Sequence, residues 1–534
     1  MTATIQVALF LLAVLALVAV AAQRLKIAPS ILLVIAGIAL ALVPGLPPVE
    51  LAPELVLLVL LPPLIYSAGV SMSWREFRYN LRPITLLAFG CVVFTTCAVA
   101  AAVHYLLGWQ WGVAFLLGAI VAPPDVVAPL AIARRLGLPR RLLVVLEGEG
   151  LANDATALIL YRFAVLAITT GSFSFPQAAG TFGLIVVGEI VYGIGVGWLS
   201  LRLRQWAHNP RVEITLSLMT PYLAYWIPEH LGGSGVLATV AAGLYVSWNG
   251  PRLISSATRL QGIFFWDLII YLIEGFVFLV TGLQARMLIE KAHDFPVGEL
   301  LIATAVTAAI VIAARFVWVF PATYLPRWLI PSLARRDPAP PWKHAFVLSF
   351  TGVRGVVSLA AALAIPLTIQ TGAPFPQRDL ILFATFGVII ITLVGQGLML
   401  PAVIRWLRIG DEGRAEHRRE QEAELAARSQ AIGAARRHLE RIAGERNLGS
   451  EVVDFLNLRH DHRERLIPSD LDGGRAQMRV SNNLRMELIA AEREFLHQLL
   501  RDGKITDESR RRLERELDLE EATILSRREG EIPL

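Results

Sequence analysis

Apolar stretches long enough to cross a membrane recur along the first 408 residues of the chain. About 20 consecutive apolar residues span the hydrocarbon core of a bilayer when they form an α-helix. By this measure the sequence predicts an all-α membrane protein with about 13 transmembrane helices, near residues 4–22, 29–44, 54–71, 83–106, 111–132, 142–169, 176–201, 212–229, 234–248, 262–284, 298–320, 344–369 and 379–407.

The pattern changes at residue 409, where apolar stretches give way to opposite charges at helical spacing. We therefore predict a transmembrane domain at 1–408 and a charged helical C-terminal domain at 409–534. The C-terminal domain holds 23 Lys and Arg against 27 Asp and Glu, a net charge of −4, and residues 1–408 hold 26 against 17, a net charge of +9. Excess positive charge in a membrane domain is typical of topology control and argues against binding of nucleic acid.

The composition agrees with a protein embedded in the lipid bilayer. Hydrophobic residues make up 55% of the chain, charged residues make up 17%, and the mean hydropathy is +0.56. This is too apolar for an ordinary soluble protein. Both cysteines, Cys91 and Cys97, fall in an apolar stretch, which argues against a disulfide scaffold or a cysteine metal site.

Basic residues cluster after every odd-numbered apolar stretch. Loops on the other side are nearly free of Lys and Arg, apart from Arg286 and Lys291. The positive-inside rule then predicts an N-terminus outside and a cytoplasmic C-terminal domain in a plasma (inner) membrane protein. The basic groups are Arg24 and Lys26; Arg75, Arg78 and Arg82; Arg134, Arg135, Arg140 and Arg141; Arg202, Arg204 and Arg211; Arg252 and Arg259; and Arg327, Arg335 and Arg336.

Several acidic residues interrupt the sixth apolar stretch, where an unpaired charge costs several kcal/mol. Asp154 lies twelve residues after Leu142, so at ~1.5 Å per residue it sits roughly 18 Å deep, near the bilayer midplane. Glu147 shares a helical face with Asp154, and Glu149 lies on a different face. We interpret Asp154 as the residue that carries the chemistry and Glu149 as an acid that is paired structurally.

A proline pair breaks the fifth apolar stretch. Pro123 and Pro124 remove helical hydrogen bonds, and Asp125 follows them directly. Broken backbone at membrane depth is tolerated where it is buried in protein or lines a cavity. Freed carbonyls, helix ends and an adjacent carboxylate form a ready cation site. The alternative is a structural kink without a ligand role.

The twelfth stretch carries a glycine-flanked arginine, Arg354, in Gly352-Val353-Arg354-Gly355. Arginine stays charged at depth, so it needs a carboxylate, and we predict an ion pair with Glu149. The fifth and twelfth stretches are seven apart, so corresponding helices run in opposite directions, as in transporters with inverted repeats and two discontinuous helices. Arg162 and Arg315 are expected to snorkel or to pair structurally. Glu274 is interpreted as a helix-packing hydrogen-bond acceptor, with contact to the transport core as the alternative.

Taken together, these motifs resemble those of the cation–proton antiporter 1 family, the sodium/proton exchangers, over about residues 5–408. The resemblance implies that Asp154 binds Na⁺ or H⁺, that Asn153 organises the site and Asp125 supports it, and that Glu149 pairs with Arg354. It also implies homodimers and electroneutral one-for-one exchange. The motifs are Leu61-Pro62-Pro63-Leu64, Pro124-Asp125 with Val127-Ala128, Glu147-Gly148-Glu149 with Asn153-Asp154-Ala155-Thr156-Ala157, Gly352-Val353-Arg354-Gly355 and Val394-Gly395-Gln396-Gly397.

Three positions depart from the family pattern. Ser67 stands where many members have an acidic residue, Pro124 stands where Thr precedes the Asp, and Gly150 replaces a Ser. Two oxygen ligands are therefore missing or replaced. We retain Ser67 and Glu147 as candidate contacts along the ion path, with Glu147 at the entrance.

The resulting hypothesis is exchange of Na⁺ for H⁺ by alternating access, with both ions competing for Asp154 and Na⁺ bound at Asp154 and Asp125. No bound cofactor is required, because the ions are cargo. The departures keep K⁺, Li⁺ or another cation open as the cargo. A membrane-embedded hydrolase using Asp125 and Asp154, and a sensor that does not transport, are the alternatives from other classes.

Overall fold

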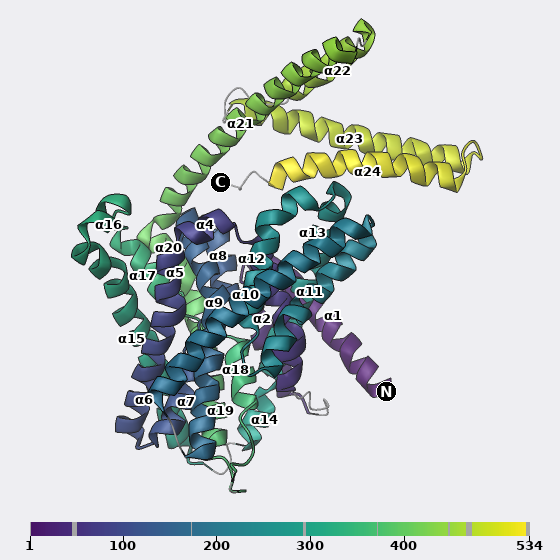
Figure 1. Ribbon diagram of the computed structural model, residues 1–534. Helices are drawn as coiled ribbons and strands as arrows, with labels where there is room; N and C mark the ends of the chain where they lie inside the picture. The colour runs from purple at the N-terminus through teal and green to yellow at the C-terminus, as the bar shows by residue number, and fades with distance from the viewer. Residues whose placement is uncertain are drawn as a thin grey trace. The chain divides into compact units, whose positions relative to one another are not determined.

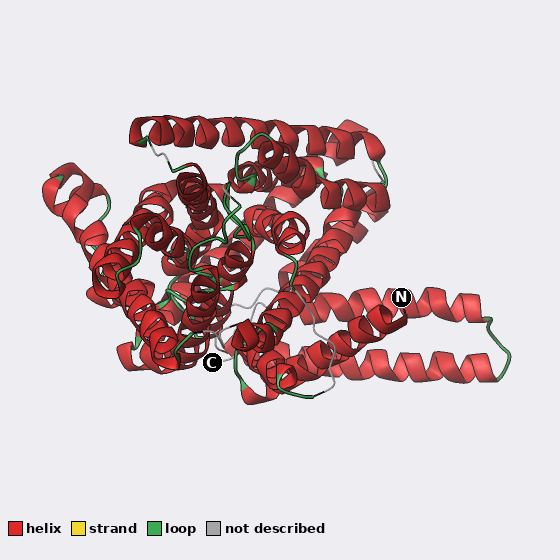
Figure 2. Cartoon of the chain, turned by 90° about the horizontal axis from the view of Figure 1, so that it is seen from below, coloured by secondary structure: helices red, strands yellow, loops and turns green. Residues whose placement is uncertain are grey.

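The computed structural model describes residues 2–44, 51–171, 174–291, 295–370, 372–446, 449–465 and 473–529. Within these residues the chain is helical and forms no β-strand, as Figure 2 shows. The chain divides into two compact units, Met1–Arg414 and Ala415–Leu534.

In the first unit, seven helices of the described residues are long and apolar enough to cross a membrane: Gln6–Leu25, Leu81–Leu107, Arg140–Thr170, Pro176–Ala207, Ser256–Lys291, Val297–Leu329 and Arg378–Leu407. Shorter apolar helices occupy Pro29–Ala41, Leu55–Ser71 and Trp111–Val121. The chain is thus an all-α membrane protein, as its sequence predicts.

The helices of this unit, labelled in Figure 1, are joined mostly by short connections along the chain. Their bounds are α1 Thr2–Leu25, α2 Pro29–Ala41, η1 Leu55–Leu60, α3 Leu61–Ser71, α4 Trp74–Tyr79, α5 Leu81–Thr85, η2 Leu86–Cys91, α6 Val92–Leu107, α7 Trp111–Val121, α8 Val127–Arg135, α9 Arg140–Thr170, α10 Phe175–Ala207, α11 Pro210–His230, α12 Val236–Leu253, α13 Ser256–Leu283, α14 Ala285–Lys291, α15 Val297–Leu329, α16 Pro331–Arg336, α17 Trp342–Phe350, α18 Val356–Leu363, α19 Arg378–Ile390, η4 Ile391–Gln396 and α20 Gly397–Leu407.

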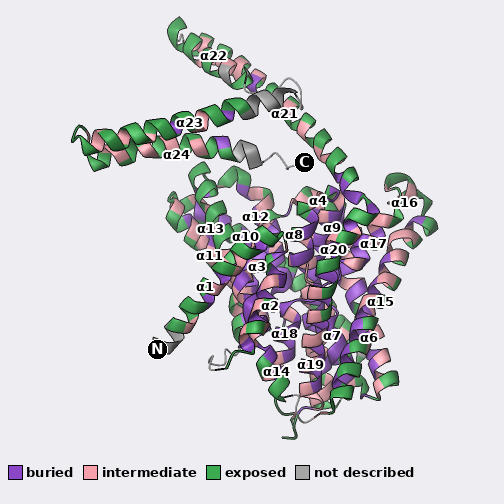
Figure 3. Cartoon of the chain, turned by 180° about the vertical axis from the view of Figure 1, so that it is seen from behind, coloured by how far each residue is buried: buried purple, intermediate pink, exposed green. Residues whose placement is uncertain are grey.

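Small residues let these helices approach closely, while large apolar side chains point outward. On α10, Gly193 packs so tightly that an added Cβ would lie 2.1 Å from the carbonyl oxygen of Ala238 on α12. Leu184 on α10 is 77% exposed, although it is apolar. Small residues at helix contacts and apolar residues on the outer face are typical of membrane bundles, because lipid covers that face. Figure 3 shows how exposed and buried positions alternate around these helices.

Two sets of helices can be distinguished in the described part of the membrane unit, and helices within each set pack against each other more extensively than across the sets. We call α2, α3, α11, α12 and α13 the scaffold set, and α6, α7, α9, α15, α18 and α19 the core set. Figure 1 shows α6, α7, α9 and α15 on one side of the unit and α2, α11 and α13 on the other. The division matters because the cavity described below is lined by residues of both sets.

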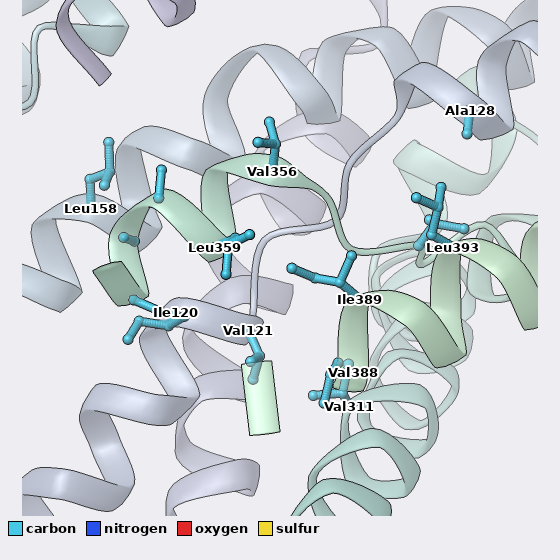
Figure 4. Packing of buried hydrophobic residues seen from close by; sticks show 14 of the residues in the cluster. Ile120, Val121, Ala128, Leu158, Val311, Val356, Leu359, Val388, Ile389 and Leu393 are labelled. Carbon is cyan, nitrogen blue, oxygen red and sulfur yellow. The ribbon is translucent and has the colours of Figure 1, made fainter. Parts of the chain in front are cut away.

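In the described part of this unit, two helices are discontinuous. Helix α7 ends at Val121 and α8 begins at Val127, and α17 ends at Phe350 and α18 begins at Val356. Buried apolar side chains from α7, α18 and α19 surround the crossing of the two breaks. Figure 4 shows four of them, Ile120, Val121, Leu359 and Ile389.

The second unit consists of charged helices. Helix α21 (Ile409–Arg446) leads into it, and α22 (Ser450–Arg465), α23 (Gly473–Arg501) and α24 (Asp507–Glu529) follow. Helices α23 and α24 pack against each other, with Ile489 and Ile524 buried. Arg493 on α23 pairs with Asp518 on α24 at 2.6 Å.

A cluster of arginines around one aspartate joins the ends of three membrane helices. Asp337 accepts hydrogen bonds from Arg82 at 2.8 Å and Arg327 at 2.9 Å and pairs with Arg141 at 2.9 Å. Partial burial by itself would raise the pKa of Asp337, but the hydrogen bond from Arg141 and the three positive charges hold it below its usual range. The folded state therefore favours the ionised carboxylate.

Replacing Asp337 by Asn is expected to lower the stability of the protein at pH 7 by roughly 1–3 kcal/mol, because charged hydrogen bonds are lost. A lowered folded pKa contributes stability above the unfolded pKa of about 3.9, and this contribution is lost as the pH falls through the folded pKa. Unfolding of both proteins in detergent at pH 7 and pH 3 measures this. A difference in stability that did not narrow at pH 3 would contradict the prediction, and Asp379→Asn, at a side chain 43% exposed, is the control.

Candidate functional site

The two breaks are tied together where they cross. The backbone N–H of Asp125 donates a hydrogen bond to the carbonyl oxygen of Val353, with the two atoms 2.7 Å apart. Arg354, which is 1% exposed, donates from Nε to the carbonyl of Val121 at 2.8 Å and from Nη2 to the carbonyl of Ala122 at 3.1 Å. These carbonyls end α7 and have no helical partner. Arg354 therefore neutralises the negative end of a half-helix.

Asp125 occupies the opposite, positive ends of the half-helices. Its Oδ1 accepts a hydrogen bond from the backbone N–H of Val127 at the start of α8, at 2.9 Å. Gly355, which precedes α18, lies so close that an added Cβ would stand 2.0 Å from Asp125 Oδ2. The carboxylate thus lies beside the N-termini of both α8 and α18, where a negative charge is favoured. Asp125 helps to fix the crossing and also lines the cavity described below.

Helix α9 brings the Asn-Asp pair to the same place. Asn153 is completely buried, and its Nδ2 donates to the carbonyl of Pro124 at 2.6 Å. Its Oδ1 has no hydrogen-bond partner among the described residues, although it is buried. An unsatisfied buried oxygen is costly unless a donor or a cation reaches it. Asn153 therefore holds the broken backbone beside Asp154 and has one oxygen free.

A cavity of about 490 Å³ opens beside the crossing, between the core and scaffold sets. Asp125 and Asp154 line it, and so do Ser67 on α3 and Glu147 on α9. It extends from these residues to Arg134 of α8, whose side chain is 58% exposed and pairs with Glu147. The structure thus brings together both predicted ion-binding acids and both predicted ion-path residues.

The ion pair predicted between Glu149 and Arg354 is wrong. Glu149, which is completely buried, pairs with Arg315 of α15 through both of its oxygens, and the bond from Arg315 Nη2 to Glu149 Oε2 measures 2.8 Å. Arg354 instead finds carbonyl oxygens at the end of α7. The physical reason is that broken helices expose unpaired carbonyls, which satisfy a buried guanidinium as a carboxylate would. Arg315 is 1% exposed and does not snorkel.

Close packing around position 150 leaves no room for the side chain of a serine. An added Cβ at Gly150 would lie 2.4 Å from a methyl group of Val126, which belongs to the break between α7 and α8. A serine side chain would require that valine to move. The glycine lets α9 approach the break closely and leaves one hydroxyl fewer at the site.

Some contacts of the acidic residues were outside the reach of sequence reasoning. Glu189 of α10 accepts hydrogen bonds from the backbone N–H groups of Gly235 and Leu237, both at 3.1 Å, at the start of α12. Arg162 pairs with Glu229. Neither contact follows from the pattern of one helix.

Helix α13 also lines the cavity with two acids. Glu274 and Asp267 both face it, from the scaffold side. The signal for this in the sequence is their spacing of seven residues, which places both on one helical face. The helix-packing role predicted for Glu274 finds no support, because this carboxylate has no hydrogen bond or ion pair with any residue that the structure describes.

Discontinuous helices that cross beside an acidic cavity at membrane depth are the architecture of secondary transporters. The chain belongs to the sodium/hydrogen exchanger family: the family model described as sodium/hydrogen exchanger, transmembrane, matches residues 10–406. It is a cation–proton antiporter 1 member, which confirms the resemblance read from the motifs. This is a family of transporters and not of enzymes.

The relatives extend the similarity over most of the chain. An uncharacterised Na⁺/H⁺ exchanger of Mycobacterium tuberculosis is 35% identical over 523 residues, covering 95% of this chain and 94% of the relative. The Na⁺/H⁺ antiporter ApNhaP of Aphanothece halophytica is 34% identical, covering 77% of this chain and 75% of the relative. A sodium, potassium, lithium and rubidium/H⁺ antiporter of Bacillus pumilus is 32% identical, covering 68% of this chain and 56% of the relative.

A solved structure supports the fold. The sodium proton antiporter MjNhaP1 of Methanocaldococcus jannaschii superposes with a TM-score of 0.59 at 18% sequence identity, covering 76% of this chain and 98% of that chain. At this identity the likeness speaks for the fold alone.

Proposed function

We propose that this protein exchanges Na⁺ for H⁺ across the plasma membrane by alternating access, with both ions competing for Asp154. The observation that carries the proposal is the cavity at the helix crossing, which Asp125 and Asp154 line together. A carboxylate without a partner at membrane depth needs a cation or a proton.

The ligands of the cation follow from the site. Within the described residues, no three side chains of Asp, Glu, His or Cys lie close enough to hold a metal ion together. We therefore infer that Na⁺ is held by Asp154 with few other charges, aided by Asp125 and by the free Oδ1 of Asn153. Such a weak, mixed oxygen site suits an ion that must be released. No resident cofactor enters this proposal.

Competition at one carboxylate couples the two fluxes. Asp154 loaded with Na⁺ or with H⁺ carries less charge than the bare carboxylate. Only the loaded site therefore changes readily between the outward-facing and the inward-facing state. One ion is exchanged for one proton, without net charge movement. A change of one pH unit shifts the competition by about 1.4 kcal/mol, which is roughly tenfold in apparent Na⁺ affinity.

The cargo is proposed as Na⁺, with K⁺ and Li⁺ as the alternatives. The Bacillus pumilus relative is named for sodium, potassium, lithium and rubidium, and the A. halophytica relative for sodium. Ser67 and Gly150 supply fewer oxygens than acidic and serine side chains would at these positions. A less demanding oxygen set is compatible with a broader range of monovalent cations.

We further propose the arrangement of the chain in the membrane. The basic clusters place the N-terminus outside and residues 409–534 in the cytoplasm, with about 13 spans in residues 1–408. The two broken helices support an inverted repeat, in which α7–α8 corresponds to α17–α18. A homodimer is the proposed assembly.

Replacing Asp154 by Asn is expected to abolish exchange, because the neutral amide neither binds a proton nor attracts a cation. The measurement is dissipation of a pH gradient by Na⁺, K⁺ and Li⁺ added to proteoliposomes, with Asp379→Asn as a matched control away from the cavity. Undiminished exchange by Asp154→Asn would overturn the assignment of Asp154. Activity with K⁺ but not with Na⁺ would overturn the choice of cargo, and no flux with any cation from the wild-type protein would favour a sensor.

A further inference from the structure

The cavity has a second acidic wall, which the exchange mechanism above does not use. Glu274 lies on α13, eighteen residues after the start of that helix at Ser256. It lines the same cavity as Asp125 and Asp154 but comes from the scaffold set and not from the core set. Asp267 lies two helical turns earlier on the same face and is exposed. Acidic groups thus follow α13 from the exposed end of the cavity toward its buried end.

The charges that line the cavity are strongly unbalanced. The single basic residue among the lining residues is Arg134, and it already pairs with Glu147. Asp125 and Glu274 interact electrostatically with each other, as do Asp125 and Asp154. Like charges in a cavity with apolar walls repel more strongly than in water. The full set of lining acids is Asp125, Glu147, Asp154, Asp267 and Glu274.

A structural role for Glu274 has no support in its contacts. The carboxylate is half-buried and has no hydrogen bond or ion pair within the described part of the chain, whereas the structural acid Glu149 has Arg315 on both oxygens. A membrane carboxylate that is retained without a partner marks an ion or proton path. Glu274 is thus an acid that faces the cavity without a protein partner among the described residues.

We propose that Glu274 is a staging site for the incoming alkali cation, which it holds on the scaffold wall of the cavity before the cation reaches Asp154. This inference rests on the proposed exchange function. Glu274, Asp125 and Asp154 are not close enough to hold one ion together, so the cation passes from one wall to the other. Ser67, on the neighbouring scaffold helix α3, carries no charge, and Glu274 is the acid that the scaffold set offers at this depth.

The location of Glu274 predicts a sided effect. When the core set moves to expose Asp154 to the other side of the membrane, Glu274 stays with the scaffold set. It therefore serves cations that enter through the cavity, at the end that carries Arg134. An acidic cleft raises the local concentration of a cation and its rate of capture, and salt screens this effect.

Glu274→Gln is expected to raise the apparent KM for Na⁺ about tenfold when the cation enters from the Arg134 end, with little change in kcat. The measurement compares everted vesicles, where that end faces the medium, with right-side-out vesicles, where KM stays unchanged. Added choline chloride narrows the difference between variant and wild type. Glu274→Asp, which keeps the charge, restores most of the wild-type KM. The matched control is Glu299→Gln, at an exposed position near the start of α15.

The outcomes separate this inference from the exchange function. A wild-type KM in Glu274→Gln, an equal shift from both sides, an effect insensitive to salt, or a loss of kcat alone would each overturn the staging role. If one of these results is found and Asp154→Asn still abolishes exchange in the same vesicles, the exchange function stands and only the staging role falls. If Asp154→Asn leaves exchange intact, the exchange function itself fails.

Discussion

Replacing Glu149 by Gln is expected to destabilise the protein by about 3–5 kcal/mol, because it leaves the charge of Arg315 buried without a carboxylate. Both side chains of this pair are inaccessible to solvent, at 0% and 1% exposure. The pair joins α9, which carries Asp154, to α15 within the core set. Denaturant unfolding of the purified protein in detergent measures the loss in free energy of unfolding.

A double-mutant cycle tests the physical reason. Glu149→Gln combined with Arg315→Gln removes both charges, so we expect the double variant to be more stable than Glu149→Gln alone. The control is Glu290→Gln, which breaks the ion pair between Arg286 and Glu290. The side chains of these two residues are 46% and 65% exposed, respectively. Such exposed pairs contribute about 0–1 kcal/mol. Equal losses for the buried and exposed pairs would show that Glu149 is not the structural acid of the core.

Replacing Gly355 by Ala is expected to reduce exchange by about 100-fold, a size typical when a reacting group is displaced by about 1 Å. An added Cβ would stand 2.0 Å from Asp125 Oδ2 and 2.5 Å from Cγ, so the carboxylate must move. It cannot move freely, because its Oδ1 accepts from the N–H of Val127 and its own N–H donates to Val353. Na⁺-driven dissipation of a pH gradient in proteoliposomes measures the loss.

A second glycine supplies the control for this experiment. Gly395 lies in the π-helical segment Ile391–Gln396, is exposed, and has no atom within 4 Å of an added Cβ. Gly395→Ala should therefore leave exchange near the wild-type rate. Wild-type exchange by Gly355→Ala would mean that the position of Asp125 at the N-terminus of α18 does not matter for transport.

The pattern of single stretches determined a large part of this protein. Apolar length predicted an all-α membrane protein, and the proline pair before Asp125 predicted the broken helix between α7 and α8. Helical periodicity placed Glu147 and Asp154 on one face, and both line the cavity. These features are local, because the length of a helix, a missing backbone donor and the facing of side chains depend on residues close in sequence.

Only the tertiary structure decided which groups meet across helices. Glu149 and Arg315 are 166 residues apart, and periodicity tells which face a charge occupies but not which neighbour faces it. The sequence predicted a carboxylate partner for Arg354, but the guanidinium instead donates to backbone carbonyls at the end of α7. The sequence predicted a packing role for Glu274, but the position of α13 in the fold puts this residue on the wall of the cavity. The sequence by itself determined the charges and their depth, and the packing of distant helices decided their partners, because a buried charge is satisfied by whatever polar group the fold brings to it.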